Sequence, residues 1–446
     1  MNWSCLETVR DAAFGPPAEI AACTDAVLAR HVAYCHGNSP FYRRRFAELA
    51  LRPEDITCTA DLARLPLTTK SDLEKCGEEF LCVPMREIVD ICQTSGTTGL
   101  PVSMLQTEND LLRVSHNEAL SFDGAGLTAD DRVVVACALG RCFMAGLAYF
   151  EGLRQLGATV VRCGGGAPAL LAEAVLAHRP TALVCVPSHA VELARELSTR
   201  GIEPRELGIH TLVCIGEPVR RPDLSSSALG SRLEALFGAR VLGTYASTEM
   251  ATAFAECVEG CGGHVHPHLM AVEIVDEQGV ALPPGEVGEV VATPLGVTGM
   301  PLLRFRTGDI ASLIDEPCAC GRRTMRLGPV RGRRNHMLKI RGTTVYPAAV
   351  FDVLQEIPAV RNYYLEVYED YDLSDRVRVV VGIDDVENAP TTEQITQRLR
   401  GRIRVVVEVC AASPDEVRSR TMLPGKRKPV RIFDHRQRRE SGMEKV

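Results

Sequence analysis

Short apolar runs alternate with helical patterns through the middle of this 446-residue chain. Strand-like runs occupy residues 133–139, 158–162, 181–186 and 211–215, and amphipathic helical patterns occupy residues 144–156, 168–177 and 189–199 between them. Consecutive strands that are joined through a helix run parallel, because the helix returns the chain to the same end of the sheet. The alternation therefore predicts a parallel sheet with helices packed on its faces.

The remaining sections have different patterns. The first ~90 residues look helical, polar and punctuated by proline, and from about residue 242 short strands at 271–275 and 289–293 alternate with turns, which predicts a β-rich section. Further along, helical patterns at 346–354 and 392–402 and strands at 363–368 and 377–383 indicate a second α/β region. We therefore expect an α/β protein of two domains, with residues 1–338 in the first and 339–446 in the second.

Composition excludes several classes of protein. The net charge is −7 and aromatic residues make up only 5% of the chain, so neither a basic nucleic-acid surface nor base-stacking platforms are expected. The most apolar stretch, 133–150, contains Arg141 and two glycines, which argues against a membrane span. Residues 1–16 include acidic side chains and no apolar core, so we expect a cytoplasmic protein.

Seventeen cysteines are scattered mostly one at a time among apolar residues. An odd number cannot all pair within one chain, and single thiols behave as small buried apolar groups. In a reducing compartment, clustered cysteines are better interpreted as metal ligands than as disulfides.

The segment from Thr94 to Pro101 reads Thr-Ser-Gly-Thr-Thr-Gly-Leu-Pro. Glycine lets the backbone approach an anion closely, and hydroxyl groups supply hydrogen-bond donors, so the segment suits phosphate binding. It lacks the Gly-Lys-Ser/Thr ending of the common nucleotide P-loop. On composition alone, an ordinary surface loop explains it equally well.

Further motifs follow that loop in a fixed order. Residues 215–218 read Ile-Gly-Glu-Pro, residues 245–249 Tyr-Ala-Ser-Thr-Glu and residues 301–309 Pro-Leu-Leu-Arg-Phe-Arg-Thr-Gly-Asp, ahead of Gly-Arg at 332–333 and Lys-Ile-Arg-Gly at 339–342. Over roughly residues 30–435 the series resembles the adenylate-forming enzymes, which include acyl-CoA synthetases and peptide-synthetase adenylation domains. Details such as Pro187-Ser188 and the glycines at 164–166 resemble the phenylacetate-CoA ligase branch.

The resemblance implies a large adenylate-forming domain, built of parallel-sheet layers and a β-rich subdomain, with a small mobile α/β domain after it. It also implies ATP, Mg²⁺ and coenzyme A as cofactors. Asp309 would bind the ribose hydroxyls, and Glu249 would hold the magnesium ion and take part in catalysis. The nucleotide-binding residues that it implies are Thr94, Ser95, Gly96, Thr97, Thr98, Gly99, Gly216, Glu217, Pro218, Tyr245, Ala246, Ser247, Thr248, Asp309 and Arg333.

A basic stretch near the C-terminus resembles the closing motif of the family, which supplies a catalytic lysine. Alignment on residues 431–434 selects Lys428, whereas alignment on the Gly-Lys pair selects Lys426, and we favour Lys428. A solvated basic run is the alternative interpretation. A lysine suits the role because its ammonium group is a mobile point charge.

One departure from the branch concerns the hinge. Where two acidic residues are usual, this chain has Asn335 and His336. The acceptor of the acyl group therefore stays open at this point between coenzyme A and a carrier-protein thiol or an amine.

The resemblance also implies a small carboxylic acid as substrate, with an aromatic acid favoured, and it allows a homodimer. Neither nucleic acid nor a membrane is an expected partner. The predicted acid-binding residues are Phe143, Ala145, Gly146, Ser188 and Gly243, although core packing explains such positions equally well.

Cysteine and histidine cluster in two places of the β-rich section. Cys318 and Cys320 flank one alanine, and Cys257, Cys261, His264, His266 and His268 lie about sixty residues earlier. Four nitrogen or sulfur ligands with no open position make a structural zinc site. The resemblance selects Cys257, His264, Cys318 and Cys320, with Cys261 in reserve. His264, His266 and His268 alternate along the chain, and they cannot all bind one ion.

Overall fold

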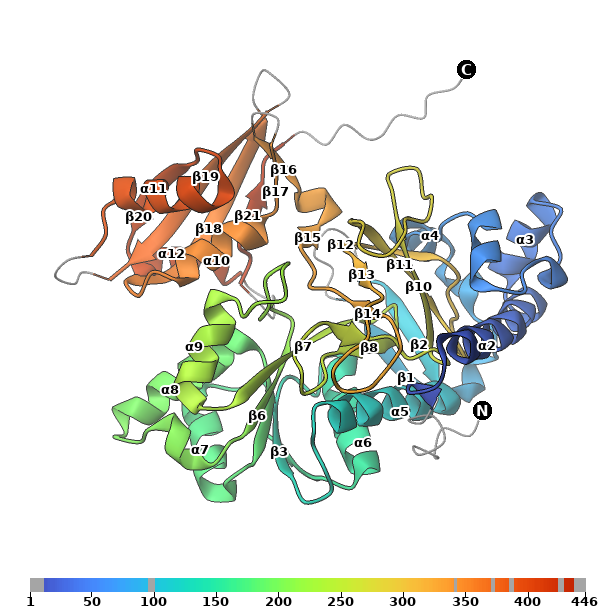
Figure 1. The fold of residues 1–446 in the computed structure, drawn as a ribbon, viewed down its shortest axis with the longest axis horizontal. Helices are drawn as coiled ribbons and strands as arrows, with labels where there is room; N and C mark the ends of the chain where they lie inside the picture. Colours follow the sequence, from blue (N-terminus) through green and yellow to red (C-terminus); the bar gives the residue numbers. More distant parts are fainter. Residues whose placement is uncertain are drawn as a thin grey trace. The chain divides into compact units, whose positions relative to one another are not determined.

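The computed structural model describes residues 12–94, 101–340, 343–369, 374–384, 389–423 and 429–436 (Figure 1). Contacts divide the chain into two compact units, Met1–Val330 and Arg331–Val446, and each is described by itself. The predicted domain boundary between residues 338 and 339 stays a prediction.

A six-stranded sheet lies at the centre of the first unit, in the order β4-β3-β5-β6-β7-β8. All neighbouring pairs are parallel except β7 and β8, which are antiparallel. The strands are β3 (Arg132–Ala136), β4 (Thr159–Arg162), β5 (Ala182–Cys185), β6 (Thr211–Ile215), β7 (Arg240–Ser247) and β8 (Thr252–Ala255). The predicted parallel sheet is confirmed.

Helices cover both faces of this sheet (Figure 1). Side chains of β5 and β6 alternate between two apolar clusters, as a sheet buried on both faces requires. One cluster contains Leu183 and Leu212 with side chains of three helices, and the other contains Val184 and Val213 with side chains of two. The helices on the first face are α7 (Pro168–His178), α8 (Pro187–Thr199) and α9 (Ala228–Phe237), and those on the second are α5 (Glu108–Gly124) and α6 (Met144–Leu156).

The N-terminal part is helical, as expected, and ends in a hairpin that the sequence patterns did not predict. Its helices are α2 (Pro17–Asn38), α3 (Pro40–Glu48) and α4 (Lys70–Cys76). The antiparallel strands β1 (Ile88–Gln93) and β2 (Ser103–Thr107) flank the segment that contains the predicted phosphate loop.

The β-rich section follows β8. Strands β10 (Met270–Val275), β11 (Gly288–Pro294) and β12 (Phe305–Ala311) pair antiparallel in that order. A second small sheet contains β9 (Gly263–His264), β13 (Leu313–Ile314) and β14 (Arg326–Leu327).

The second unit has one apolar core beneath a sheet in the order β20-β19-β18-β21. The strands of this sheet are β18 (Val360–Glu369), β19 (Asp375–Ile383), β20 (Glu408–Ala412) and β21 (Ile432–Asp434). The second unit also contains the short strands β15 (Gly332–Arg333), β16 (Leu338–Ile340) and β17 (Thr343–Val345). Its helices are α10 (Pro347–Gln355), α11 (Thr392–Ile403) and α12 (Pro414–Thr421). The four elements expected here are present as α10, β18, β19 and α11.

Candidate active site

Several predicted site residues lie at or just after the carboxyl ends of neighbouring strands, at one edge of the central sheet. Phe143 follows β3, Ser188 follows β5, Glu217 follows β6, and Tyr245 lies near the end of β7. The carboxyl ends of parallel strands meet at the same edge, where open α/β sheets bind their ligands. Strand order thus brings together motifs that are far apart in the sequence.

Tyr245 and Asp309 connect this edge to the β-rich section. The Tyr245 hydroxyl donates a hydrogen bond of 2.8 Å to Oδ2 of Asp309 on β12. The Tyr245 ring also stacks on Phe254, with 6.0 Å between ring centroids. Two of the predicted nucleotide-binding motifs, 64 residues apart in the chain, therefore share a direct contact.

A bulge in β12 presents Asp309. Val291 pairs with Arg306 and Glu289 with Ile310, so three residues of β12 lie opposite one residue of β11. Gly308, at the centre of the bulge, has a φ of +76°, a value that favours glycine. The bulge gives Asp309 a direction that a regular strand would not give it.

Hydrogen bonds hold that bulge in shape. Oε1 of Glu289 accepts the Gly308 N–H at 3.2 Å and the Nε of Arg306 at 3.1 Å, and the Thr307 hydroxyl donates to the Val290 carbonyl at 2.8 Å. Glu289 is only 4% exposed. The sequence motifs did not indicate Glu289, and the available signal was its place in the predicted strand next to the 301–309 motif.

The segment after β6 lies beside the start of α8. Oε2 of Glu217 accepts the backbone N–H of Ser188 at 2.9 Å. Gly216 has a φ of +74°, and both Gly216 and Pro218 are exposed. Two backbone segments thus meet at Glu217, and the exposed surface at Gly216 and Pro218 lies beside them.

The structure describes the predicted phosphate loop only at its base. Thr94 donates its N–H to the Val102 carbonyl at 3.0 Å, and its hydroxyl accepts the Val102 N–H at 3.0 Å. These two bonds close the loop across its base. Five residues of the prediction, Ser95, Gly96, Thr97, Thr98 and Gly99, lie outside the described residues, as do Lys426 and Lys428.

The end of β7 and the turn after it contain the remaining residues of the Tyr245 motif. Ala246 is exposed, and Ser247, Thr248 and Glu249 are half-buried. Arg333 lies in β15 of the second unit, followed by a short 3₁₀ turn that contains Asn335 and His336.

The predicted acid-binding residues include two glycines with packing roles. A Cβ at Gly146 would lie 2.2 Å from the Ala138 carbonyl oxygen, and one at Gly243 would lie 3.2 Å from Cγ2 of Val219. Phe143 caps α6 and is half-buried. Half-buried Ala145 packs against the apolar cluster of α5 and α6, so core packing contributes at these positions.

The four predicted zinc ligands lie together in one cluster. The ligand atoms of Cys257, His264, Cys318 and Cys320 all lie within 4.8 Å of one another. Sγ of Cys257 is 3.6 Å from Sγ of Cys318, and Sγ of Cys320 is 3.5 Å from Nε2 of His264. Bonds of about 2.0–2.3 Å to a tetrahedral zinc ion would place ligand atoms roughly 3.5–3.8 Å apart, so the donor set fits zinc.

Neighbouring groups prepare His264 for this role. Its Nδ1 lies 3.1 Å from the hydroxyl of Thr324, which leaves Nε2 facing the cysteines. Burial, with a contribution from Arg322 and Arg326, lowers the pKa of His264 to about 3. The ring is therefore neutral, as a metal ligand must be.

Cys261 lies beside the cluster. Its Sγ is 3.5 Å from Sγ of Cys318, but it also accepts a hydrogen bond of 2.8 Å from Arg326. His266 and His268 are buried, with their ring centroids 6.4 Å apart. None of these three residues belongs to the set of four converging ligand atoms.

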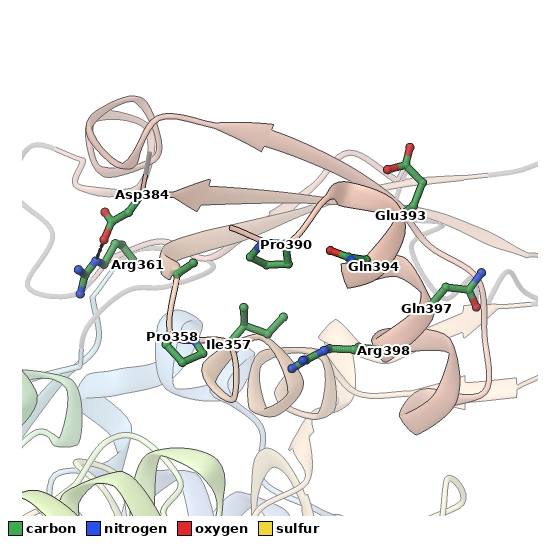
Figure 2. Close-up of a pocket in the computed structure, with 10 residues that line it drawn as sticks. Ile357, Pro358, Arg361, Asp384, Pro390, Glu393, Gln394, Gln397 and Arg398 are labelled. Carbon is green, nitrogen blue, oxygen red and sulfur yellow. Dashed lines mark hydrogen bonds and ion pairs between the residues drawn. The ribbon is translucent and has the colours of Figure 1, made fainter. Parts of the chain in front are cut away.

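One pocket of about 860 Å³ lies elsewhere, in the second unit (Figure 2). Its wall includes the start of β18 and one face of α11, with Arg361 paired to Asp384 and with Glu393 and Arg398 on the helix. No predicted site residue lines it. Among the described residues, no helix combines the length and apolarity that crossing a membrane requires.

Comparisons with known proteins agree with the order of the motifs. The profile of AMP-binding enzymes matches residues 16–299, and that of the AMP-binding enzyme C-terminal domain matches residues 342–436. A phenylacetate-coenzyme A ligase of Thermus thermophilus is 36% identical over 357 residues, 78% of either chain. Another, from Escherichia coli, is 30% identical over 390 residues, 84% of this chain and 86% of the relative.

A solved structure of 2-hydroxyisobutyryl-CoA ligase, in the postadenylation state with an acyl-AMP, has the same fold. It matches with a TM-score of 0.84 and 23% identity, and the match covers 94% of this chain and 90% of that one.

Proposed function

The chain belongs to the AMP-binding enzyme family, and from this premise we propose that it joins a carboxylic acid to coenzyme A at the expense of ATP. The acid first becomes an acyl-adenylate, and the acyl group then passes to the thiol of coenzyme A. We propose an aromatic acid as the substrate, which agrees with the phenylacetate-coenzyme A ligases among its relatives.

The first half-reaction joins two anions. A carboxylate oxygen attacks the α-phosphorus of ATP, the bond between the α-phosphorus and the bridging oxygen breaks, and pyrophosphate leaves with the electron pair. Protein groups promote such a transfer by fixing geometry and neutralising charge. In the second half-reaction the thiolate sulfur of coenzyme A bonds to the acyl carbon, and AMP leaves.

Each motif has a role in this scheme. Asp309 binds the ribose hydroxyls in the direction that the β12 bulge sets, and Tyr245 holds that carboxylate. The exposed surface at Gly216 and Pro218 contacts the adenine ring. The Thr94–Gly99 loop surrounds the terminal phosphates, with Ala246, Ser247 and Thr248 beside them.

Lys428 brings a positive charge to the reacting carboxylate and the α-phosphate. Glu249 would hold Mg²⁺, whose chemistry is to screen the phosphate charges through oxygen ligands. Arg333 belongs to the hinge segment and contacts the nucleotide. Phe143, Ala145, Gly146, Ser188 and Gly243 shape the acid pocket.

We assign the Cys257, His264, Cys318 and Cys320 cluster to a structural zinc ion. Three sulfurs and one imidazole nitrogen supply four ligands, so the ion would keep no position for a substrate. It would fasten the segment after β8 to the segment before β14. We propose a cytoplasmic location, because thiols that bind a metal stay reduced in that compartment.

The hydrogen bond from Tyr245 to Asp309 is the observation that carries the proposal, because it joins two nucleotide-binding motifs at the ligand-binding edge of the sheet. The test is pyrophosphate release from ATP with a panel of aromatic and aliphatic acids. Acid-dependent release followed by a thioester on addition of coenzyme A is the expected result. No acid-dependent release would refute the function, and release without a thioester would favour a carrier-protein or amine acceptor.

A further inference from the structure

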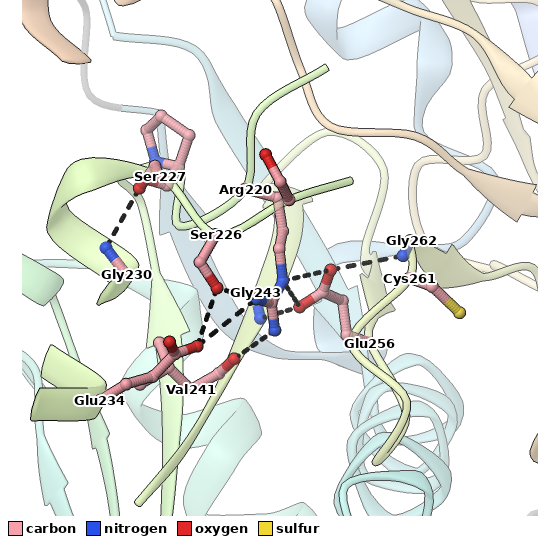
Figure 3. A network of polar contacts seen from close by, with 12 residues as sticks. Arg220, Ser226, Ser227, Gly230, Glu234, Val241, Gly243, Glu256, Cys261 and Gly262 are labelled. Atoms are coloured by element: carbon pink, nitrogen blue, oxygen red, sulfur yellow. Dashed lines mark hydrogen bonds and ion pairs between the residues drawn. The ribbon is translucent and has the colours of Figure 1, made fainter. Parts of the chain in front are cut away.

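A buried ion pair lies beside the site without belonging to any of its motifs (Figure 3). Glu256 follows β8 and is 5% exposed, and its partner is Arg220, five residues after the end of β6. Oε2 of Glu256 accepts the Nε–H of Arg220 at 3.2 Å and the backbone N–H of Gly243 at 2.7 Å. Oε1 accepts the backbone N–H of Gly262 at 3.3 Å. One carboxylate therefore joins three separate segments.

The other donors of Arg220 fix its orientation. It donates to the Ser226 hydroxyl at 2.7 Å and to the Val241 carbonyl at 2.6 Å, and the Ser226 hydroxyl donates in turn to Glu234 at 2.8 Å (Figure 3). The planar guanidinium group thus binds strand β7 and the segment just before α9 in one geometry.

Arg220 ends the segment 216–220, which contains the predicted adenine contact. At its other end this segment is held by Glu217, which accepts the Ser188 N–H. Between the two ends, Val219 packs against Gly243, where a Cβ would approach to 3.2 Å. The segment is therefore fixed on both sides, by β7 through Glu256 and by the start of α8 through Glu217.

Glu256 binds strand β7 at Gly243, close to a predicted nucleotide-binding residue. Gly243 lies two residues before Tyr245, and residues two apart point to the same face of a strand. The hydrogen bond at the Gly243 N–H therefore fixes the backbone two residues before Tyr245, whose hydroxyl contacts Asp309. Buried ion pairs add little net stability compared with apolar residues of similar size, so stability alone does not account for this network.

We propose that Glu256, acting through Arg220 and Gly243, is a positioning residue for nucleotide binding. The inference rests on the proposed function and assigns this site a residue that lies outside its motifs. It also links the site to the metal cluster, because Cys257 follows Glu256 directly and Gly262 belongs to the loop between Cys261 and His264. Loss of the metal is expected to weaken nucleotide binding through the same carboxylate.

The test compares E256Q with E273Q, the same substitution in a different ion pair of the first unit. Glu273 receives two hydrogen bonds, of 3.0 and 2.8 Å, from the buried Arg304, so E273Q makes the same chemical change away from the segment 216–220. ATP affinity by calorimetry, KM and kcat for acid-dependent pyrophosphate release, and thermal unfolding would be measured on the full chain. We expect E256Q to raise the Kd and KM for ATP about tenfold with kcat within about threefold, and E273Q to leave ATP affinity within about twofold.

R220K provides a second variant if E256Q fails to fold. Lysine keeps the charge but cannot reproduce the three directed bonds, so we expect a similar loss of ATP affinity. Equal ATP affinity in these variants and in E273Q would overturn the inference. A wild-type chain that binds no ATP would overturn the proposed function and this inference with it.

Metal removal tests the proposed link between the Cys/His cluster and nucleotide binding. Chelation of the wild type is expected to lower ATP affinity several-fold, and chelation of E256Q to cause little further loss, because groups that act in one network are not additive. Unchanged ATP affinity in the chelated wild type, with metal loss verified by elemental analysis, would refute the link.

Discussion

The sheet edge and the cluster of Cys257, His264, Cys318 and Cys320 are two polar regions of the first unit, and they are built differently. At the edge, Glu217, Tyr245 and Glu249 are half-buried, and each site side chain comes from a different strand or loop. In the cluster, Cys257, His264 and Cys318 are buried and Cys320 is half-buried, and their ligand atoms converge within 4.8 Å. We expect the first arrangement to bind a molecule that enters and leaves, whereas the second could hold a single ion.

The difference teaches where substitutions act. A group at the edge contributes most when substrate is bound, so its loss changes kinetics more than folding. A closed ligand set contributes mainly to the folded state, so its loss changes stability more than chemistry. The following predictions test this contrast, in order of their expected effect on activity.

Lys428→Ala has the largest expected effect. It removes the charge that neutralises the reacting anions, so acid-dependent pyrophosphate formation is expected to fall by roughly 10²–10³-fold. Stopped-assay pyrophosphate measurement checks this value. Lys426→Ala is the matched control, with an expected change of only a few-fold. A larger loss in the control would transfer the catalytic role to Lys426.

Asp309→Asn has the second-largest expected effect on activity. The amide loses the charge that strengthens hydrogen bonds to the ribose, so we expect KM for ATP to rise roughly 10–100-fold with little change in the melting temperature. Steady-state kinetics with varied ATP measure this effect. Asp276, which caps a turn of the same β-rich section, provides the control Asp276→Asn with unchanged KM. Equal KM values in both variants would contradict the ribose assignment.

Tyr245→Phe removes one hydroxyl and keeps the stacking on Phe254. Loss of the hydrogen bond to Asp309 is expected to raise KM for ATP about 3–10-fold. The same assay measures it. A combined Tyr245→Phe and Asp309→Asn variant would show less than the product of the two effects if the residues act as one unit. Independent effects would contradict that coupling.

Cys318→Ser has the smallest expected effect on turnover and the largest on stability. Without the metal we expect the melting temperature to fall by roughly 5–15 °C, while kcat at low temperature and saturating ATP stays within about threefold. Scanning calorimetry and elemental analysis check stability and metal content. Cys23→Ser, at a half-buried thiol outside the cluster, is the control. A collapse of kcat in a folded Cys318→Ser protein would show that the cluster acts on turnover itself and not only on stability and ATP affinity.

The parallel sheet was predictable from the sequence because its pattern is local. The helix at 144–156 and the strand at 211–215 have the predicted bounds in the structure as α6 and β6. Helix α5 was not predicted, because its buried face contains polar residues such as Asp110 and Arg113. Arg113 is satisfied by the carbonyls of Leu295 and Ala251, and hydropathy carries no information on such distant partners.

The hairpin was missed for a related reason. Strand β1 pairs with β2 in a two-stranded sheet and leaves Val89 and Ile91 largely exposed, so its apolar residues do not mark a buried face. In the site, the motifs pointed to Tyr245 and Asp309 but not to their contact. Glu256 was also missed, because its partners lie on segments that only the folded chain brings together.

The bulge of β12 has a consequence for changes in chain length. Arg306 and Ile310 already pair with β11, so the sheet would close equally well with two fewer residues between them. Insertions or deletions at 307–309 would therefore leave the β-rich section folded while they removed or redirected the carboxylate. In a set of related sequences, the length of this segment would separate chains that bind the nucleotide from chains that have kept only the fold.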